Sequence, residues 1–163
     1  MNYLNLDEKK VGSVVDDLNV LLADYHIYYQ KLRNFHWNII GKSFFDLHEK
    51  FEELYEDAKV KIDEIAERIL TLRHQPVSNF SDYLKSSNLK ESASDIRDVE
   101  MVKILLKDHG AILKQMRKVI KTAEKAGDEG SIDLTGAYIR ELEKVSWMLE
   151  TWVMKTDENH LKS

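Results

Sequence analysis

The chain has 163 residues, of which 43% are hydrophobic and 33% are charged, with one proline, six glycines and no cysteine. This balance is typical of one folded domain with a hydrophobic core and excludes a disordered or loop-rich chain. Without cysteine, neither disulfides nor thiolate metal sites can form. The net charge of −5, with no cationic tail at either end, disfavours a general nucleic-acid binder.

The N-terminal sequence MNYLNLDEKKVGSVVDD lacks the basic and then apolar layout of a secretory signal. No run approaches the ~20 apolar residues that cross a bilayer. We therefore expect a cytoplasmic protein without membrane association. We also expect one domain over residues 1–163, because no linker, internal repeat or low-complexity tract interrupts the chain.

Apolar residues in the first forty positions recur at the three- and four-residue spacing of an amphipathic helix. This pattern predicts a helix from about Lys9 to Ile39, which Gly41 is suited to end. The side chains expected to face the core are Val11, Val14, Val15, Leu18, Leu22, Tyr25, Tyr28, Leu32 and Phe35.

A second helix is predicted from an N-cap at Ser43 to about Arg73, where Gln75 and Pro76 end it. Its core positions are Phe44, Leu47, Phe51, Leu54, Ala58, Ile62, Ile65, Ile69 and Leu72. The connection from Pro76 to about Ser94 is too long for a simple hairpin. Within it, SNFSDYLKSS predicts a short helix capped by Ser78 or Asn79.

A third long helix is predicted from Ser94 or Asp95 to about Lys125, followed by a turn at GDEG, residues 127–130. A fourth is predicted from Ser131 to around Lys155. Short, long and short connections between four helices predict an all-α four-helix bundle, with one long crossover carrying the short extra helix.

Potential metal ligands share one narrow stripe on the second helix, about 130° from its core stripe. They are His48, Glu52, Asp63 and Glu67. A solvated helix face is the ordinary interpretation of such a stripe. However, the apolar residues Phe45 and Leu70 lie at its two ends, and exposing their side chains to water is unfavourable.

Distance along the helix limits how these ligands can act together. The His48–Glu52 and Asp63–Glu67 pairs have centres ~22 Å apart at ~1.5 Å per residue. Metal–ligand bonds are only ~2.0–2.2 Å long. Either no shared site exists, or a second copy of the helix supplies the other half.

An antiparallel pairing of two copies about a two-fold axis places residue i opposite residue j with a constant sum of their numbers. At a sum of 115 the facing pairs are Phe45 with Leu70, His48 with Glu67, Glu52 with Asp63, and Glu56 with Lys59. Facing carboxylates are costly unless a cation lies between them. We therefore predict two metal sites per dimer, related by an axis near Asp57 and Ala58.

His36 adds a further ligand to each site. His36 and His48 lie six residues on either side of a hairpin centred near Lys42, so antiparallel packing brings them together. Two imidazoles and three carboxylates then converge. Nitrogen and oxygen ligands without sulfur suit iron, manganese or zinc.

At these residues the chain resembles the Dps proteins, or mini-ferritins. The stretches FHWNIIGKSFFDLHEKFEELY and DEIAERIL resemble their ferroxidase signature, and the resemblance extends to the ending LEKVSWMLETW. It implies a ferritin-like bundle in a hollow shell of twelve subunits that oxidises Fe(II), preferentially with hydrogen peroxide, and stores ferric mineral. It also implies that His36, His48 and Glu52 come from one subunit, and Asp63 and Glu67 from the other.

The chain departs from the family pattern at two places. The family very often has aspartate where this chain has Glu52, and we expect the longer side chain to alter occupancy of the weaker iron position. It often has a glycine pair where this chain has Arg73 and His74, which should affect the helix end and not the chemistry. The Glu-x-x-His motif of self-contained di-iron bundles does not occur in the sequence, which favours the intersubunit arrangement.

Acidic residues at the turn into the fourth helix form a second candidate site. Their ordinary role would be to complement the helix dipole. The resemblance implies that Asp133, with Asp128, lines a negative pore that draws in Fe(II). Trp37 is interpreted as a packing residue or a radical quencher. The remaining histidines, which we do not predict to be ligands, are His26, His74, His109 and His160.

The main alternative is a nucleoid protein that protects DNA by coating it, as some members of the resembled family do. That function requires a cation-rich tail or surface, which this sequence lacks. A helical scaffold without chemistry is the third interpretation.

Overall fold

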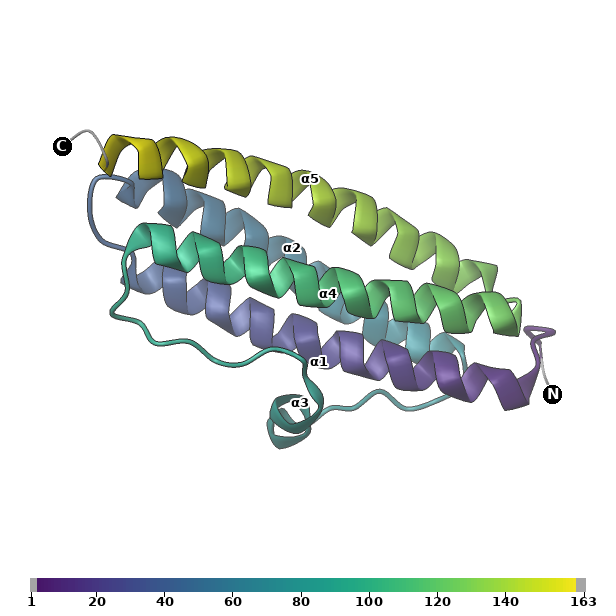
Figure 1. Ribbon diagram of the computed structural model, residues 1–163. Coiled ribbons are helices and arrows are strands. Elements are labelled where there is room, and N and C mark those ends of the chain that lie inside the picture. The colour runs from purple at the N-terminus through teal and green to yellow at the C-terminus, as the bar shows by residue number, and fades with distance from the viewer. Residues whose placement is uncertain (1–2, 161–163) are drawn as a thin grey trace.

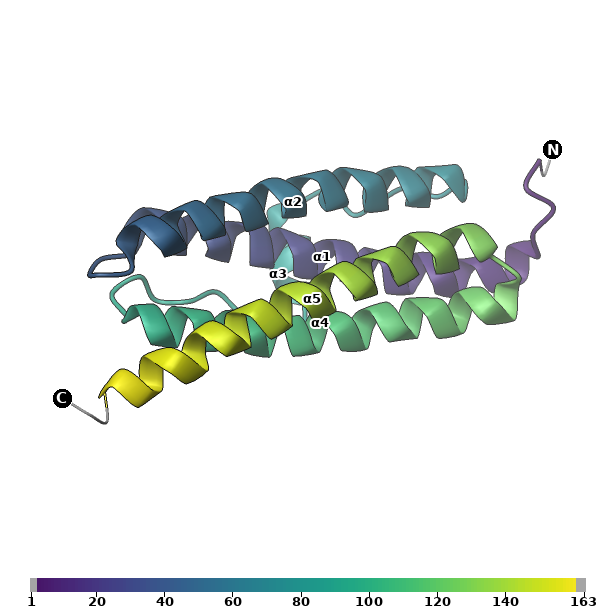
Figure 2. The same ribbon diagram turned by 90° about the horizontal axis from the view of Figure 1, so that it is seen from above.

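The computed structural model describes the backbone of residues 3–160 and the side chains of residues 3–154. The helices are α1 (Glu8–Asn38), α2 (Phe44–Thr71), α3 (Phe80–Ser86), α4 (Asp98–Ala126) and α5 (Glu129–His160). The described residues contain no strand. The four long helices form a bundle, and the crossover that carries α3 runs along its side (Figures 1 and 2). The predicted all-α bundle with one long crossover is confirmed.

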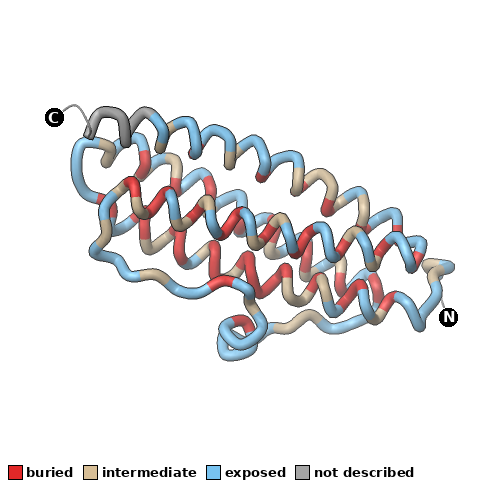
Figure 3. Tube along the Cα trace, in the orientation of Figure 1, coloured by how far each residue is buried: buried red, intermediate tan, exposed pale blue. Residues whose placement is uncertain are grey.

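Helix α1 is the centre of the packing, since it contacts α2, α3 and α4. Every core residue predicted on α1 is buried, and on α2 only Phe44 and Ile62 remain partly exposed. Buried positions follow the inner faces of the helices in Figure 3. The 3.6-residue period therefore located the core correctly.

Helix α4 begins at Asp98, and the prediction of Ser94 or Asp95 was wrong. The preceding chain bends at residues 94–95, just after the side-chain amide of Asn34 on α1 donates to the carbonyl of Ser92 at 3.1 Å. This tertiary contact fixes the chain two residues before the predicted start.

Helix α5, in contrast, starts earlier than predicted, at Glu129, and its backbone continues to His160. Asp128 caps it: one carboxylate oxygen accepts the Ser131 N–H at 3.0 Å, and the other accepts the Ser131 hydroxyl at 2.7 Å. The turn residues after Gly127 therefore already belong to the helix start.

Helix α2 ends in a left-handed residue that is not glycine. Arg73 has a φ of 68°, while the N–H groups of Arg73 and His74 bond the carbonyls of Leu70 and Ile69 at 2.8 and 3.2 Å. These are the two bonds of a Schellman motif, which glycine usually completes. The arginine adopts that geometry at a conformational cost of about 1–2 kcal/mol.

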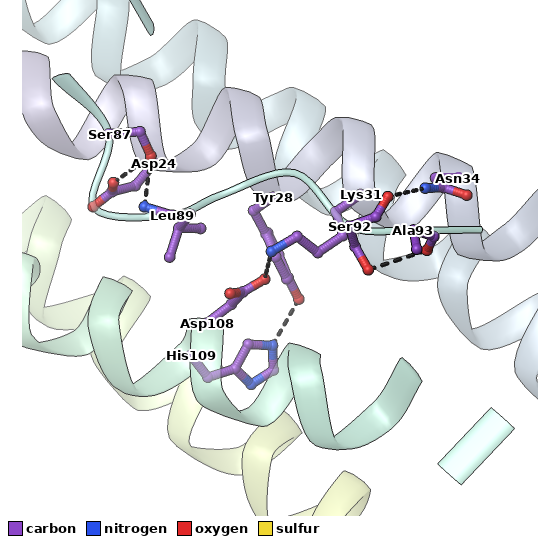
Figure 4. A network of polar contacts seen from close by, with 10 residues as sticks. All are labelled: Asp24, Tyr28, Lys31, Asn34, Ser87, Leu89, Ser92, Ala93, Asp108 and His109. Carbon is purple, nitrogen blue, oxygen red and sulfur yellow. Dashed lines mark hydrogen bonds and ion pairs between the residues drawn. The ribbon is translucent and has the colours of Figure 1, made fainter. Parts of the chain in front are cut away.

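Ion pairs inside the bundle join helices that are distant in sequence. Lys31 of α1 and Asp108 of α4 meet at 2.6 Å and are both nearly inaccessible to solvent (Figure 4). Burial raises the pKa of Asp108, although the bond from Lys31 opposes this change. Removing either partner would leave a buried charge unpaired, which costs far more than the pair itself contributes.

The C-terminal part of α2 anchors the start of α5. The Arg68 guanidinium pairs with the buried carboxylate of Asp128, and its Nε donates to the Ser131 hydroxyl at 3.0 Å. It also covers Gly130 so closely that a Cβ there would come within 2.7 Å of the guanidinium. Arg68 therefore fixes the turn between α4 and α5 onto α2.

A hydrogen-bonded chain crosses the bundle from α1 through α4 to α5. The Tyr28 hydroxyl lies 2.7 Å from Nε2 of His109, and Nδ1 of His109 lies 2.8 Å from the Ser146 hydroxyl. Figure 4 shows the Tyr28–His109 contact beside the Lys31–Asp108 pair. Burial lowers the pKa of His109 to about 4, so the imidazole is neutral near neutral pH.

None of the helices in the described part of the chain is long and apolar enough to cross a membrane.

The low pKa of His109 predicts a loss of stability in acid. Between pH 6.5 and about 4 the unfolded chain protonates this histidine and the folded chain does not, so stability falls as the pH falls through that window. We expect the contribution to total about 3 kcal/mol. Thermal unfolding of His109→Gln across this range should show a shallower pH dependence than the wild type. The exposed control His74→Gln should retain the wild-type slope, and equal slopes in all three proteins would contradict the assignment.

The Arg68–Asp128 pair predicts a strong effect of removing its cation. Arg68→Met should lower the free energy of unfolding by about 3 kcal/mol, because the Asp128 carboxylate stays buried without its partner. Denaturant titration checks this value. The matched control is Arg117→Met, which breaks an exposed pair with Glu143 and should cost less than about 1 kcal/mol. Equal losses in the two variants would show that burial does not govern the effect.

Candidate metal centre

The hairpin of α1 and α2 brings His36 and His48 into contact, as the sequence predicted. Their ring centroids lie 3.8 Å apart and their planes differ by 17°. His36 is nearly buried at 8% exposure, whereas His48 is half-buried. The two imidazoles thus form a stacked pair near the turn that joins the helices.

Backbone hydrogen bonds fix which nitrogen of each ring is free. Nδ1 of His36 lies 2.7 Å from the carbonyl oxygen of His48, and Nδ1 of His48 lies 2.8 Å from the carbonyl oxygen of His36. A carbonyl oxygen only accepts, so each Nδ1 carries the hydrogen. In the neutral rings both Nε2 atoms therefore keep a lone pair, which is the state a metal ligand requires.

Two aromatic rings hold this pair in place. Phe44 stacks on His48 with centroids 4.8 Å apart, and Tyr55 packs edge-on against His36 at 5.2 Å. Burial, together with the nearby carboxylates of Glu52 and Glu56, raises the pKa of Tyr55. The sequence pattern predicted Phe44 as a core residue and indicated no role for Tyr55. The seven-residue spacing from His48 to Tyr55 was the signal available for finding it.

The predicted carboxylates lie on the outer face of α2. Glu52, Asp63 and Glu67 are all exposed, with Glu52 one turn beyond His48. Within the described residues of one chain, no three histidine or acidic side chains converge on a possible metal position. The chain therefore presents an imidazole pair and, further along the same helix, a separate carboxylate pair.

The apolar ends of the same stripe are exposed as well. Phe45 is 81% exposed and Leu70 is 55% exposed. A groove of about 720 Å³ lies on another side, between α1 and α3. It includes Trp37, which is over half exposed and lies against the Arg33 guanidinium at 4.8 Å. The imidazole pair is not part of this groove.

The two acids predicted to line a pore differ in their exposure to solvent. Asp128 is 1% exposed, neutralised by Arg68 and occupied in capping α5, so its carboxylate does not project from the chain. That part of the prediction is corrected, because the turn needs the carboxylate inside. Asp133, one turn into α5, is exposed.

The other histidines whose side chains are described have structural contacts. His26 stacks on Tyr83 of α3 at 3.9 Å, and His109 belongs to the buried chain with Tyr28. Nδ1 of His74 lies 2.9 Å from the Leu72 carbonyl at the end of α2. The side chain of His160 lies outside the described residues.

Comparison with known proteins places this geometry in a family. The model of the ferritin-like domain matches residues 15–158. A DNA protection during starvation protein of Porphyromonas gingivalis is 41% identical over 155 residues, which cover 95% of this chain and 98% of the relative. DNA protection during starvation protein 2 of Bacillus anthracis is 41% identical over 140 residues, covering 86% and 96%.

Solved structures agree with this placement. The crystal structure of a Dps protein from Vibrio cholerae O1 superposes with a TM-score of 0.90 at 44% identity, covering 94% of this chain and 96% of that one. That protein is described as a member of a broad superfamily of ferritin-like diiron-carboxylate proteins. Because the family model and these relatives span most of its length, the chain belongs to the ferritin-like family, within its Dps branch.

Proposed function

We propose that this protein is a cytoplasmic ferroxidase that oxidises Fe(II), preferentially with hydrogen peroxide, and stores the ferric product in a hollow shell of twelve subunits. Iron is its substrate and cargo. The observation that carries the proposal is the stacked His36–His48 pair, whose Nδ1 atoms are both bonded to backbone carbonyls and whose Nε2 atoms remain available. Fixing the tautomer and orientation of both rings before iron arrives favours binding.

Completion of each site by a second subunit is supported by the outer face of α2. His36, His48 and Glu52 would come from one subunit, with Asp63 and Glu67 from its partner. Pairing at a residue sum of 115 buries Phe45 against Leu70, two apolar side chains that one chain leaves exposed. Each dimer would then hold two equivalent iron sites related by its axis.

The ligand set suits the proposed reaction. Imidazoles hold Fe(II), and carboxylates stabilise the additional positive charge as Fe(III) forms. Hydrogen peroxide accepts two electrons, one from each of two Fe(II) ions, and its O–O bond breaks to give two hydroxide ions. No hydroxyl radical is released when both electrons arrive together.

Iron entry is proposed to use Asp133. This exposed carboxylate, near the start of α5, would line a negative pore where three subunits meet. A converging acidic surface raises the local concentration of a divalent cation. Arg68 and Asp128 would hold the supporting turn in place from inside.

The shared site predicts that two inactive variants complement each other. The first carries His36→Ala and His48→Ala; the second carries Asp63→Asn and Glu67→Gln. In a mixed dimer one site lacks all four groups and the other is intact. Co-assembly in equal amounts should therefore restore about a quarter of the wild-type sites. The measurement is ferric absorbance after anaerobic Fe(II) loading and peroxide addition.

The control replaces the second variant by a chain carrying all four substitutions, which can form no intact site with the first. Its mixture should stay as inactive as either parent. Failure of the complementary mixture to gain activity, with assembly confirmed by mass, would reject the shared site. Full activity of the histidine variant alone would reject the ligand assignment.

DNA binding is the second candidate, favoured by the names of the Porphyromonas and Bacillus relatives. This chain carries a net charge of −5, and Lys9 and Lys10 are balanced by Asp7 and Glu8. Neutralising DNA phosphates requires clustered cations. We therefore propose that any protection of DNA comes from consuming Fe(II) and peroxide.

This distinction predicts that the protein does not retard duplex DNA in a gel at ~150 mM salt. It should still prevent strand breakage by Fe(II) and peroxide. The variant with His36→Ala and His48→Ala should lose that protection, because only iron chemistry supplies it. A complex that survives this salt, or protection that persists in the variant, would favour binding instead.

A further inference from the structure

The Tyr28–His109 pair has no part in the proposed iron site, yet its hydrogen bonds have a defined direction. The Ser146 hydroxyl donates to the carbonyl of Leu142 at 2.7 Å. It therefore accepts from Nδ1 of His109, and Nε2 of His109 is left to accept the hydroxyl hydrogen of Tyr28. The phenol thus points its proton at a neutral base.

Burial of the proton acceptor distinguishes this arrangement among the tyrosines of the described chain. The hydroxyls of two tyrosines donate to a group that can take up a proton: Tyr28 to His109, and Tyr138 to the exposed carboxylate of Glu64. The Tyr83 hydroxyl bonds only a carbonyl, that of Val77. Tyr28 and His109 are 2% and 1% exposed, so water does not compete for this proton.

A buried phenol paired with a neutral imidazole can give up one electron. Removing an electron from a phenol makes its hydroxyl strongly acidic, and a base already in hydrogen-bond contact takes the proton without any movement of heavy atoms. Burial and the nearby Asp108 raise the pKa of Tyr28, so the proton does not leave by itself. Proton loss at Tyr28 is therefore tied to electron loss.

Tyr28 is also placed to serve the iron site. It lies on α1 eight residues before His36, which is about 12 Å along the helix axis. The proposed reaction takes one electron from each of two Fe(II) ions, so peroxide that reaches a half-loaded site meets a single Fe(II). One Fe(II) supplies only one of the two electrons that peroxide needs.

We infer that Tyr28, with His109 as its proton acceptor, is a redox-active tyrosine that supplies the second electron when peroxide reacts at a half-loaded iron site. Fe(II) gives one electron and Tyr28 the other; the O–O bond breaks and two hydroxide ions form. The phenol proton moves to Nε2 of His109, which leaves a neutral tyrosyl radical beside an imidazolium. A later Fe(II) reduces the radical, and His109 returns the proton.

This inference rests on the proposed iron oxidation and adds a source of electrons to it. Its expected benefit is that a half-loaded site reduces peroxide completely without releasing hydroxyl radical. The radical would be held in the bundle core, where Tyr25 lies between the two bonded tyrosines at centroid distances of 6.1 Å from Tyr28 and 6.5 Å from Tyr138.

Electron paramagnetic resonance of the assembled protein tests the inference. Fe(II) is added anaerobically at half the number needed to fill the sites, peroxide follows, and samples are frozen at increasing times. The wild type should show a tyrosyl signal that disappears when more Fe(II) is added. Tyr28→Phe should lose most of this signal, and His109→Gln, which keeps a side chain of similar reach but no basic nitrogen, should lose most of it too.

Tyr55→Phe and Tyr138→Phe are the matched controls, because Tyr55 touches His36 and Tyr138 is the other tyrosine bonded to a proton acceptor. Both should keep the wild-type signal. Where Tyr28→Phe fails to assemble, fluorotyrosine incorporated at position 28 keeps the ring and hydroxyl and should add a fluorine splitting to the signal.

The experiment distinguishes failure of the proposed iron oxidation from failure of the inference about Tyr28. If peroxide produces no ferric absorbance in the fully loaded wild type, the proposed function is wrong. If ferric absorbance forms but no tyrosyl signal appears, or if the signal survives Tyr28→Phe or carries no fluorine splitting, the inference about Tyr28 is wrong while iron oxidation stands.

Discussion

The antiparallel packing of α1 against α2 is the contact on which the candidate site depends. It places His36 and His48 ring to ring, and each ring then bonds the backbone carbonyl of the other residue. These two bonds tie together the ends of the hairpin and also fix both tautomers. A single structural contact therefore stabilises the turn region and prepares two metal ligands. The same hairpin turns the carboxylates of α2 outward, away from the chain that carries them.

Charged groups inside the bundle give it a specific arrangement. Lys31 with Asp108 joins α1 to α4, and Arg68 with Asp128 joins α2 to α5. Such pairs contribute little net stability compared with apolar residues, but breaking one leaves a costly buried charge. They therefore favour one alignment of the helices over sliding alternatives. That alignment keeps the acidic turn of α5 at the end of α2 and the Tyr28–His109 pair closed to water.

Most of the fold could be predicted from the sequence, because the helices are long and their apolar residues recur with a regular period. The core stripes of α1 and α2 were located residue by residue, and the short helix before residue 87 was placed within the crossover. The two misplaced helix starts have different causes, a tertiary contact before α4 and a local cap at α5. Asn34 anchors the segment before α4 at Ser92, and Asp128 caps α5 from a position that resembled an acidic surface turn. The Asn34 contact has no signal in local sequence, whereas the Asp128 cap is a local contact with Ser131 of a kind that Asp commonly makes at a helix start.

The sequence by itself determined the helices, the meeting of His36 with His48, and the outward stripe of acids, because all three follow from the 3.6-residue period and the length of one turn. Only the tertiary structure decided the hydrogen-bonding state of the imidazoles, the burial of Asp128 against Arg68 and the pairing of Tyr28 with His109. Those features join residues from 12 to 81 positions apart. Their geometry depends on how whole helices rotate and slide against one another, which no local pattern specifies.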